Sequence, residues 1–434
     1  MEKRKGNNGV FHLIIWRVVW LLVAPVLSVV FQYRRRLFRP EDYGLRPGQK
    51  LPPLFVIPNH VNNLDPFFAG YSFFDHLYFV SSEHALRKGF GSQLLRFFFG
   101  PIPIIKGTTD TAALKEILKR LKAGRNVCLF AEGNRSFSGV TGDFSPATGK
   151  LVRLAASTAG AALVTYRIRG GYFAFPRWAR KMRTGRIWGE PVRYYPPAAV
   201  KAMTPDEINA HIRADIFEDA YQTMAEHPRP YRCNNPAEDL ETALYLCPSC
   251  GKLGTLYSRG DMLYCGCGLS VHYDEYGALH TTLPSGIRPV HEPFSTVRDW
   301  WLWEYRAVEE MVRAEGFVCR DSGESLYEVT GGKAASLLVR GELSLSREGL
   351  RLVPEGSASD GGSPDASLFF PLNAIMDLVI TDQRTLSFFS EGKLYELKDE
   401  GAPVPGGKQA YRSAAKYTRI FAILSGALGD ANSQ

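Results

Sequence analysis

The strongest constraint on how this chain folds is a long apolar segment near its N-terminus, VFHLIIWRVVWLLVAPVLSVVFQ, residues 10–32. At about 1.5 Å of rise per residue, a helix of this length reaches across the roughly 30 Å hydrocarbon core of a bilayer. Arg17 costs about 2.5–3.5 kcal/mol at mid-membrane, but the surrounding Leu, Ile, Val and Phe residues, at about −0.3 to −0.6 kcal/mol each, outweigh that cost. The segment therefore prefers lipid to water.

Basic clusters flank this segment at residues 3–5 and 34–36. Because basic flanks stay on the cytoplasmic side and attract anionic head groups, both ends are expected at the same membrane face. Pro25 would kink a helix near its middle. For residues 1–38 we therefore favour two short helices in one leaflet over a single span, at the cytoplasmic face of the cytoplasmic membrane. A signal peptide is disfavoured, since the run is long and contains Arg17. A buried core helix is disfavoured because the segment shows no polar face.

Composition places the chain among globular proteins with an anionic partner. Its 434 residues exceed one ordinary core, and 45% are hydrophobic while 22% are charged. The net charge of +8 fits a nucleic acid, a membrane surface or a phosphorylated substrate. Aromatic residues, at 12%, concentrate near the N-terminus and around residues 300–305, which favours lipid.

Residues 39–235 alternate short apolar runs with an amphipathic pattern. LFVIP (54–58) and NVCLFAEG (126–133) have the form of buried strands, and TAALKEILKRLKAG (111–124) has the form of a helix ended by glycine. This alternation predicts an α/β layer structure. The polar stretch 234–243 has the composition of a domain boundary.

A histidine and an aspartate stand at the end of the first of these strands, in VIPNHVNNLDPFF, residues 56–68. Ligand chemistry in α/β proteins gathers at the carboxyl ends of strands, where His60 is expected. Asp65 followed by Pro66 has the form of a helix N-cap with proline at the first helical position. A carboxylate on one ring nitrogen fixes the tautomer and leaves the other nitrogen as a base for an alcohol. The alternative is a capping aspartate beside an unrelated histidine.

LFAEGNRSFSG (129–139) repeats the strand-to-loop design. Glu132 is a candidate to accept hydrogen bonds from substrate hydroxyls or to hold Arg135, whose planar fork suits a phosphate. Gly133 permits an unusual backbone path. Lys106, which follows another apolar run, adds a second cation. Each of these segments alone is equally compatible with a solvated turn.

Taken together, NHVNNLDP (59–66), GPIPIIKG (100–107) and FAEGNRS (130–136) resemble the first three sequence blocks of the glycerolipid acyltransferases of the lysophosphatidic acid acyltransferase type, and ALVTYRIRG (162–170) is similar to the fourth. The resemblance covers roughly residues 40–235. It implies transfer of a fatty acyl group from acyl-CoA or acyl-carrier protein to a glycerophosphate hydroxyl, and we expect lysophosphatidic acid as the acceptor and phosphatidic acid as the product. The transfer takes place at a membrane surface and needs no cofactor.

The resemblance implies that His60 is the general base and Asp65 its orienting partner. It implies a substrate-binding set composed of Lys106, Glu132, Gly133, Asn134, Arg135 and Ser136. The chain departs from the family pattern at Lys106, Ala131, Asn134 and Thr165, which puts the acceptor in doubt. Glycerol phosphate or another lysophospholipid remains an alternative acceptor, and an inactive lipid-binding adaptor is an alternative function.

Four of the seven cysteines form a separate motif in CPSCGKLGTLYSRGDMLYCGCG, residues 247–268. The first pair, around a tight turn, resembles a zinc knuckle, and the whole resembles a zinc ribbon over residues 244–285. The expected ligands of a structural zinc are Cys247, Cys250, Cys265 and Cys267. The second pair is one residue short of the usual spacing, so His272 is a reserve ligand. A redox pair or unmetallated thiols are the alternatives, and little basic charge argues against nucleic acid.

The remainder of the chain predicts a helix and a β domain. STVRDWWLWEYRAVEEMVRAEG (295–316) reads as a helix with Thr296 and Asp299 as its N-cap pair, in a linker over residues 290–330. Residues 335–434 contain short β runs, a hairpin turn at 347–349 and a final helix over 412–424. This order resembles a pleckstrin-homology-like domain. We therefore expect a β-barrel-like module closed by a helix, which binds a head group or a protein, or only packs.

Overall fold

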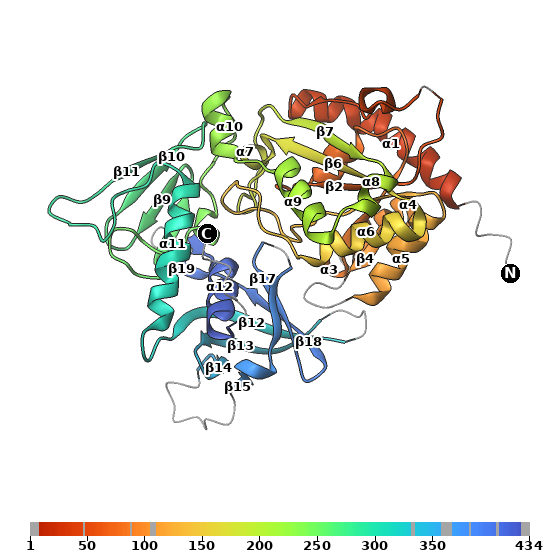
Figure 1. Cartoon of the computed structure of the whole chain (residues 1–434). Helices are drawn as coiled ribbons and strands as arrows, with labels where there is room; N and C mark the ends of the chain where they lie inside the picture. Colours follow the sequence, from red (N-terminus) through yellow and green to blue (C-terminus); the bar gives the residue numbers. More distant parts are fainter. Residues whose placement is uncertain are drawn as a thin grey trace. The chain divides into compact units, whose positions relative to one another are not determined.

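The computed structural model describes residues 8–46, 48–86, 89–104, 110–330, 335–356, 367–381, 383–404 and 408–426 (Figure 1). The chain divides into two compact units. Unit 1 contains residues 1–177 and 181–233, and unit 2 contains residues 178–180 and 234–434.

Unit 1 is built on a seven-stranded sheet with the order β1-β7-β6-β2-β5-β3-β4. Its strands are β1 (Arg34–Arg35), β2 (Leu54–Pro58), β3 (Leu77–Ser82), β4 (Ile102–Ile104), β5 (Asn126–Cys128), β6 (Ala162–Arg169) and β7 (Trp188–Tyr195). β2 lies between β5 and β6 and is parallel to both, with Phe55 paired to Val127 and to Leu163. β7 runs antiparallel to β6. The carboxyl ends of β2, β5 and β6 therefore lie at the same edge of the sheet.

Helices cover both faces of this sheet, which confirms the predicted α/β class for unit 1. They are α1 (Asn8–Val30), α2 (Asp65–Gly70), α3 (Glu83–Leu86), α4 (Gly89–Phe99), α5 (Thr111–Lys122), α6 (Ala147–Ala159), α7 (Gly171–Ala174), α8 (Pro197–Ala202), α9 (Pro205–Ile216) and α10 (Ala220–Glu226). Helices α5, α6 and α9 pack with Phe55 and Ile57 of β2 in one buried cluster. Figure 1 shows α6 and α9 side by side over the sheet. α5 ends where the sequence predicts, with Gly124 at φ +73°.

The N-terminal segment forms one helix, so the prediction of two short helices is wrong. Pro25 lies inside α1 without ending it. A proline removes one backbone hydrogen bond and bends a helix, but the helix can continue past it because the other backbone hydrogen bonds remain. By length and composition, Val10–Val30 is long and apolar enough to cross a membrane, and within the described residues it is the one helix that is.

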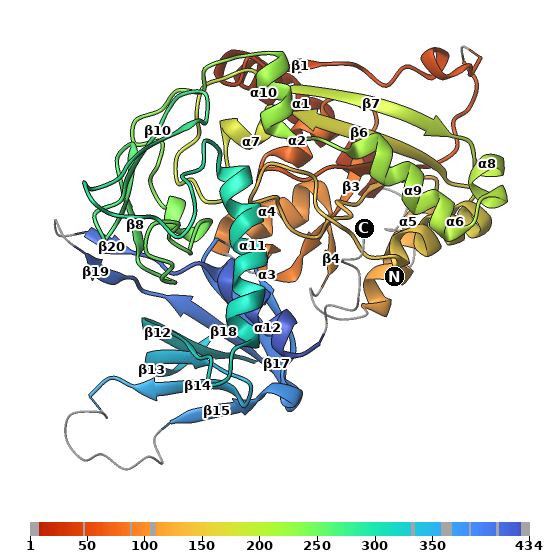
Figure 2. The ribbon, with the colours of Figure 1, turned by 60° about the vertical axis from the view of Figure 1, so that its left-hand side comes forward.

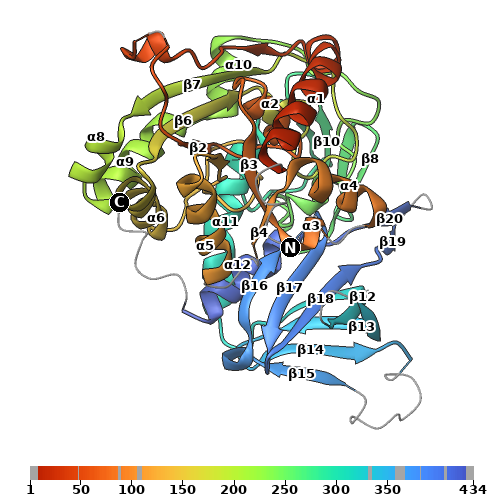
Figure 3. The same ribbon diagram turned by 90° about the vertical axis from the view of Figure 1, so that its right-hand side faces the viewer.

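One side of α1 packs against unit 1. His12, Trp16, Ala24 and Leu27 are buried, with spacings that place them on one helix face. α1 approaches closely: a Cβ on Gly70 would lie 2.5 Å from the Trp16 ring, and Gly70 belongs to α2. α4 is a second neighbour, and Figure 3 shows α1 beside it.

Unit 2 begins with a small antiparallel sheet of order β11-β10-β9-β8. Its strands are β8 (Leu256–Arg259), β9 (Met262–Cys265), β10 (Ser270–Tyr273) and β11 (Leu279–Thr282). α11 (Val297–Arg313) follows, and its N-cap is Thr296, whose side chain accepts a hydrogen bond from the Asp299 amide as predicted. α11 packs against the last helix, α12 (Ala414–Leu424) (Figure 2).

The C-terminal part of unit 2 is an open sheet of order β15-β14-β13-β12-β18-β17-β16. Its strands are β12 (Cys319–Val329), β13 (Ser336–Leu345), β14 (Gly349–Pro354), β15 (Leu368–Pro371), β16 (Met376–Ile380), β17 (Thr385–Ser390) and β18 (Lys393–Asp399), and the short pair β19 (Ala402–Val404) and β20 (Lys408–Ala410) follows. β15 and β16 are the two ends of this order, so the sheet does not close as the predicted barrel would. Helix α12 contacts β13 and β16, and the turn at Ser346–Gly349 joins β13 to β14 as the sequence predicts.

Candidate active site

Two loops leave the same edge of the unit 1 sheet. His60 comes two residues after the end of β2, and Glu132 comes four residues after the end of β5. Parallel neighbouring strands place these residues close together, because strands in a sheet are about 4.8 Å apart. β4 also ends at this edge, since it runs parallel to β3 and β3 runs parallel to β5. Lys106 follows β4 but lies outside the described residues.

His60 and Asp65 form a hydrogen-bonded pair. The Nδ1 of His60 lies 2.8 Å from the Oδ2 of Asp65, and the Asp65 side chain is fully buried whereas the His60 side chain is 19% exposed. The same Oδ2 accepts hydrogen bonds from the backbone amides of Val61, at 2.6 Å, and Asn62, at 2.9 Å. The hydrogen bond from the ring to Oδ2 places the proton of the neutral imidazole on Nδ1. The other ring nitrogen, Nε2, then has the lone pair that can take a proton.

The role of Asp65 at the helix differs from the prediction. Asp65 is the first residue of α2 and Leu64 is its N-cap, with no capping bond from a side chain. The carboxylate turns back to the preceding loop instead of capping α2. Three donors, one of them the His60 ring, outcompete a single cap bond.

Two asparagines hold this loop against β6 and α7. The side chain of Asn59 accepts from the Ile168 amide at 2.7 Å and donates to the Ile168 carbonyl at 2.9 Å. Asn62 accepts from the Leu64 amide at 2.7 Å and donates to the Gly171 carbonyl at 3.1 Å. Both side chains are fully buried. Neither asparagine was predicted from the sequence as a site residue, although both lie close to His60 in the same motif.

Glu132 binds backbone rather than the groups that the sequence suggested. Its Oε1 accepts a hydrogen bond from the His60 amide at 2.7 Å, and its Oε2 accepts one from the Gly142 amide at 2.6 Å. Burial removes water from this carboxyl and raises the pKa of Glu132 to about 8. The hydrogen bonds from the Gly142 and His60 amides lower the pKa, and the charge of Asp65 adds a smaller increase. Glu132 therefore joins the His60 loop to the loop that ends at Gly142.

The other predicted substrate-binding residues lie in the loop after β5. Gly133 has φ +66° and is exposed. The amide of Ser136 donates to the His60 carbonyl at 3.1 Å, while its hydroxyl donates to the Val140 carbonyl at 2.6 Å. The Ser136 hydroxyl therefore stabilises the turn between Ser136 and Val140. Asn134 and Arg135 are both half-buried.

A buried arginine that the sequence analysis did not single out supports this loop. Arg177 donates to the Arg135 carbonyl at 3.0 Å, and its guanidinium lies 4.2 Å from the centre of the Phe137 ring.

Thr165, one of the departures from the family pattern, is also buried and donates to Asp215 at 3.0 Å. The contacts of Arg177 and Thr165 both join segments far apart in the sequence.

We expect Glu132→Gln to lower kcat by about ten- to a hundredfold and to leave KM nearly unchanged. Glutamine keeps one oxygen for the His60 amide but directs an N–H group toward the Gly142 amide, so the His60 loop shifts, and small displacements of a reacting group have effects of about this size. Steady-state kinetics at saturating donor measure the split. A rise in KM with kcat retained would instead place Glu132 on the substrate, as the sequence analysis allowed.

The four cysteines of unit 2 form a compact cluster whose sulfur atoms all lie within 4.8 Å of one another. Cys247 and Cys267 are 3.8 Å apart between sulfurs, as are Cys250 and Cys265. A tetrahedral zinc site with bonds of about 2.3 Å separates its sulfurs by about 3.8 Å, so the residues fit this ion. His272 is not part of the cluster; its Nε2 lies 3.4 Å from Asp261.

Comparisons with known proteins find a family model and a solved structure that resemble part of the chain. The family model described as Acyltransferase matches residues 39–169. Among solved structures, the chain resembles the crystal structure of the 1-acyl-sn-glycerophosphate (LPA) acyltransferase PlsC from Thermotoga maritima, with a TM-score of 0.39 and 17% identity, over 50% of this chain and 80% of that one. A likeness of this size decides neither fold nor function. No curated protein matches the sequence.

Proposed function

We propose that this protein, whose residues 39–169 match the family model described as Acyltransferase, transfers a fatty acyl group from acyl-CoA or acyl-carrier protein to the free hydroxyl of lysophosphatidic acid, giving phosphatidic acid. The observation that carries the proposal is the 2.8 Å contact between His60 and Asp65 at the carboxyl edge of the sheet. A histidine oriented by a buried carboxylate is the group that alcohol activation requires.

The proposed reaction is a direct transfer. His60 takes the proton of the acceptor hydroxyl at Nε2 while Asp65 stabilises the imidazolium through Nδ1–H. The acceptor oxygen attacks the thioester carbonyl, the C–S bond breaks, and the thiolate leaves with the proton that His60 returns. The thioester is already activated, so a base that supplies about 10² to 10⁴ in rate, together with orientation, suffices without a metal or organic cofactor.

We assign the acceptor's phosphate to two cationic residues, Arg135 and Lys106. Arg135 is half-buried, and its neighbour Ser136 bonds to the loop that carries His60. Lys106 follows β4, which ends at the same edge of the sheet. The net charge of +8 favours an anionic lipid and an anionic membrane surface. Glycerol phosphate and other lysophospholipids offer the same hydroxyl and phosphate, so they are the alternative acceptors.

An acceptor panel tests the substrate class. Purified protein in detergent receives oleoyl-CoA with lysophosphatidic acid, glycerol 3-phosphate or lysophosphatidylcholine, and product is measured by mass spectrometry. Product chiefly from lysophosphatidic acid supports the proposal, and a preference for another acceptor replaces it within the same chemistry. If no acceptor yields product with either acyl-CoA or acyl-carrier protein, the inactive lipid-binding adaptor is supported instead.

For the membrane, we propose that α1 lies in the plane of one leaflet. Its buried face is committed to unit 1, and its opposite face exposes Val10, Ile14, Val18, Leu21, Leu22 and Val29. A helix that packs on an α/β domain cannot at the same time leave it to cross a bilayer. Arg17 is exposed and reaches the head groups from an in-plane helix more easily than from the bilayer centre.

We expect the double variant Leu21→Glu and Leu22→Glu to bind anionic vesicles at least tenfold more weakly. Leu21 is 65% and Leu22 is 68% exposed, so the change removes apolar contact with lipid, worth about 1.5–3 kcal/mol per residue, without disturbing the buried face. Flotation with vesicles measures it. Leu154→Glu is the matched control because Leu154 is exposed on α6, outside the α1 face. Equal flotation of the two proteins would contradict the in-plane anchor.

For unit 2, we propose that Cys247, Cys250, Cys265 and Cys267 hold a structural zinc ion. The support is the spacing of their sulfurs, which suits four thiolates around one ion. Two of the ligands sit on tight turns: the Gly251 amide donates to the Cys247 carbonyl, and the Gly268 amide donates to the Cys265 carbonyl. Four protein ligands close the coordination sphere, so the ion contributes stability and not catalysis.

A further inference from the structure

The loop that follows β5 holds the backbone of His60 on both sides. Oε1 of Glu132 accepts a hydrogen bond from the His60 amide at 2.7 Å, and the Ser136 amide donates to the His60 carbonyl at 3.1 Å. His60 lies beyond the end of β2, so pairing between strands does not fix its peptide groups. The position of the imidazole therefore depends on where this loop is held.

The far end of the loop determines the position of Glu132. Oε2 of Glu132 accepts a hydrogen bond from the Gly142 amide at 2.6 Å. The fit is close, because a Cβ on Gly142 would lie 3.3 Å from the same oxygen. Glu132 is thus held between two amides, and a shift of the backbone at Gly142 reaches His60 through this one side chain.

Thr141 fastens this end of the loop to residues 216–218, where α9 ends. Its amide donates a hydrogen bond to the Glu218 carbonyl at 2.9 Å. Its hydroxyl accepts one from the Glu218 amide at 2.9 Å, and lies 3.2 Å and 3.3 Å from the carbonyl oxygens of Ile216 and Glu218 as a donor. A single hydroxyl therefore both accepts and donates, which no apolar side chain can do.

Backbone contacts join the same two segments. Val140 pairs with Asp219 in an antiparallel bridge, and the Ala220 amide donates to the Gly139 carbonyl at 3.0 Å. These bonds remain when the Thr141 side chain is changed. Loss of the Thr141 hydroxyl therefore shifts the loop without releasing it.

The segment after α9 is in turn attached to β6. Oε2 of Glu218, whose side chain is 5% exposed, lies 3.5 Å from Nε of Arg169, the last residue of β6. Ile168, the residue before it, exchanges two hydrogen bonds with the Asn59 side chain next to His60. The contacts therefore form a closed frame around the base, in which the loop after β5 is one side and Asn59 is the other.

We propose that Thr141 is a positioning residue for the base: by bonding to the segment after α9, it fixes the loop from which Glu132 holds His60. Thr141 acts through Gly142 and Glu132, and not on the substrate. Its effect on the rate rests on the function proposed for His60, whereas its effect on the position of the His60 backbone does not.

Thr141→Val is expected to lower kcat about tenfold and to leave KM nearly unchanged. A methyl group cannot accept from the Glu218 amide and needs more room than the hydroxyl that lies 2.9 Å away, so the loop moves. A displacement of about 1 Å can cost about 10² in rate, and a smaller shift costs about tenfold. Thr141→Ser keeps the hydroxyl and is expected to stay within about twofold of the wild type.

Gly142→Ala tests the same link while every bond of Thr141 remains. The added Cβ would meet Oε2 of Glu132 at 3.3 Å and displace it, so a loss of about threefold or more in kcat is expected, again with KM nearly unchanged. This variant decides the question if Thr141→Val does not fold. An unchanged kcat in folded Gly142→Ala protein would overturn the proposal.

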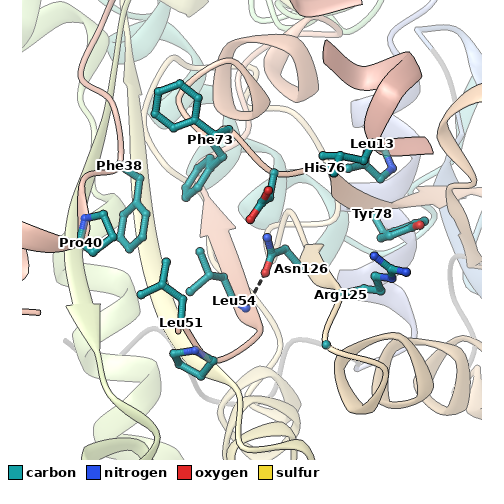
Figure 4. Close-up of a pocket in the computed structure, with 14 residues that line it drawn as sticks. Leu13, Phe38, Pro40, Leu51, Leu54, Phe73, His76, Tyr78, Arg125 and Asn126 are labelled. Atoms are coloured by element: carbon teal, nitrogen blue, oxygen red, sulfur yellow. Dashed lines mark hydrogen bonds between the residues drawn. The ribbon is translucent and has the colours of Figure 1, made fainter. Parts of the chain in front are cut away.

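Asn126→Ala is the matched control. Oδ1 of Asn126 accepts a hydrogen bond from the Leu54 amide at 2.9 Å, and Figure 4 shows this bond at the wall of a cavity of about 320 Å³. The two residues are the first of β5 and β2, so the bond joins these strands at the edge of the sheet opposite His60. The control loses a bond from a side chain to the backbone, as Thr141→Val does, and is expected to keep the kcat of the wild type.

Hydrogen exchange of the peptide that contains the His60 amide, measured by mass spectrometry, reports on the loop without any substrate. Thr141→Val should exchange this amide about tenfold faster because its bond to Glu132 opens more often, and Thr141→Ser and Asn126→Ala should match the wild type. A wild type without acyl transfer would contradict the proposed function, and exchange alone would then decide the role of Thr141. Wild-type exchange in Thr141→Val, or equal losses in Thr141→Val and Thr141→Ser, would overturn the proposal.

Discussion

Asp65→Asn is expected to lower kcat by about 10² to 10⁴ with little change in KM. Asp65 Oδ2 accepts from the His60 ring and from the amides of Val61 and Asn62. Asparagine keeps one oxygen for the amides, but it carries no charge to stabilise the imidazolium and can present N–H to the ring, which favours the wrong tautomer. The loss therefore falls on proton transfer, and a positioned base contributes about this much.

The measurement is steady-state kinetics, with circular dichroism to show that the variant folds. Asp42→Asn is the matched control, because Asp42 forms a surface ion pair with Arg36 at 3.2 Å, and such pairs contribute little. A folded Asp65→Asn protein with the kcat of the Asp42→Asn protein would remove Asp65 from the mechanism. If Asp65→Asn does not fold, His60→Ala is measured instead, because the partly exposed His60 side chain can be removed with less effect on folding.

The second large effect is expected from removing zinc. Each chain should contain one zinc ion, and a chelator or Cys250→Ser should abolish the thermal transition of unit 2, which contains β8–β11. Structural zinc in small domains contributes about 10–16 kcal/mol at pH 7, which is as large as the whole stability of a typical domain, about 5–15 kcal/mol.

Metal analysis by mass spectrometry and calorimetry measure this effect. Cys233→Ser is the matched control, since Cys233 is half-buried and belongs to unit 1. It should keep both the zinc and the transition. A Cys250→Ser protein with full zinc content, or a metal-free protein with an unchanged transition, would contradict the structural role.

The strands and helices that depend on local pattern were predictable. The apolar run at residues 54–58 forms β2, the amphipathic pattern at residues 111–122 forms α5, and Thr296 caps α11. The spacing of His60 and Asp65 also allowed their contact to be anticipated, since only four residues separate them. These features depend on periodicity, capping and short loops.

Features that depend on distant segments were not predictable. Asn59 bonds to Ile168 and Arg177 bonds to Arg135, across separations that no local pattern encodes. The docking of α1 depends on Gly70 leaving room for Trp16. The C-terminal sheet stays open because β15 and β16 take opposite ends of the strand order, which short β runs alone do not determine.

The most direct test of the central claim is acyl transfer from oleoyl-CoA to lysophosphatidic acid by wild-type protein and by His60→Ala, measured side by side as phosphatidic acid formed. The account predicts product from the wild type and a loss of at least a hundredfold in the folded variant. Phosphatidic acid formed at the same rate by His60→Ala would contradict it, because no base at the end of β2 would then be needed.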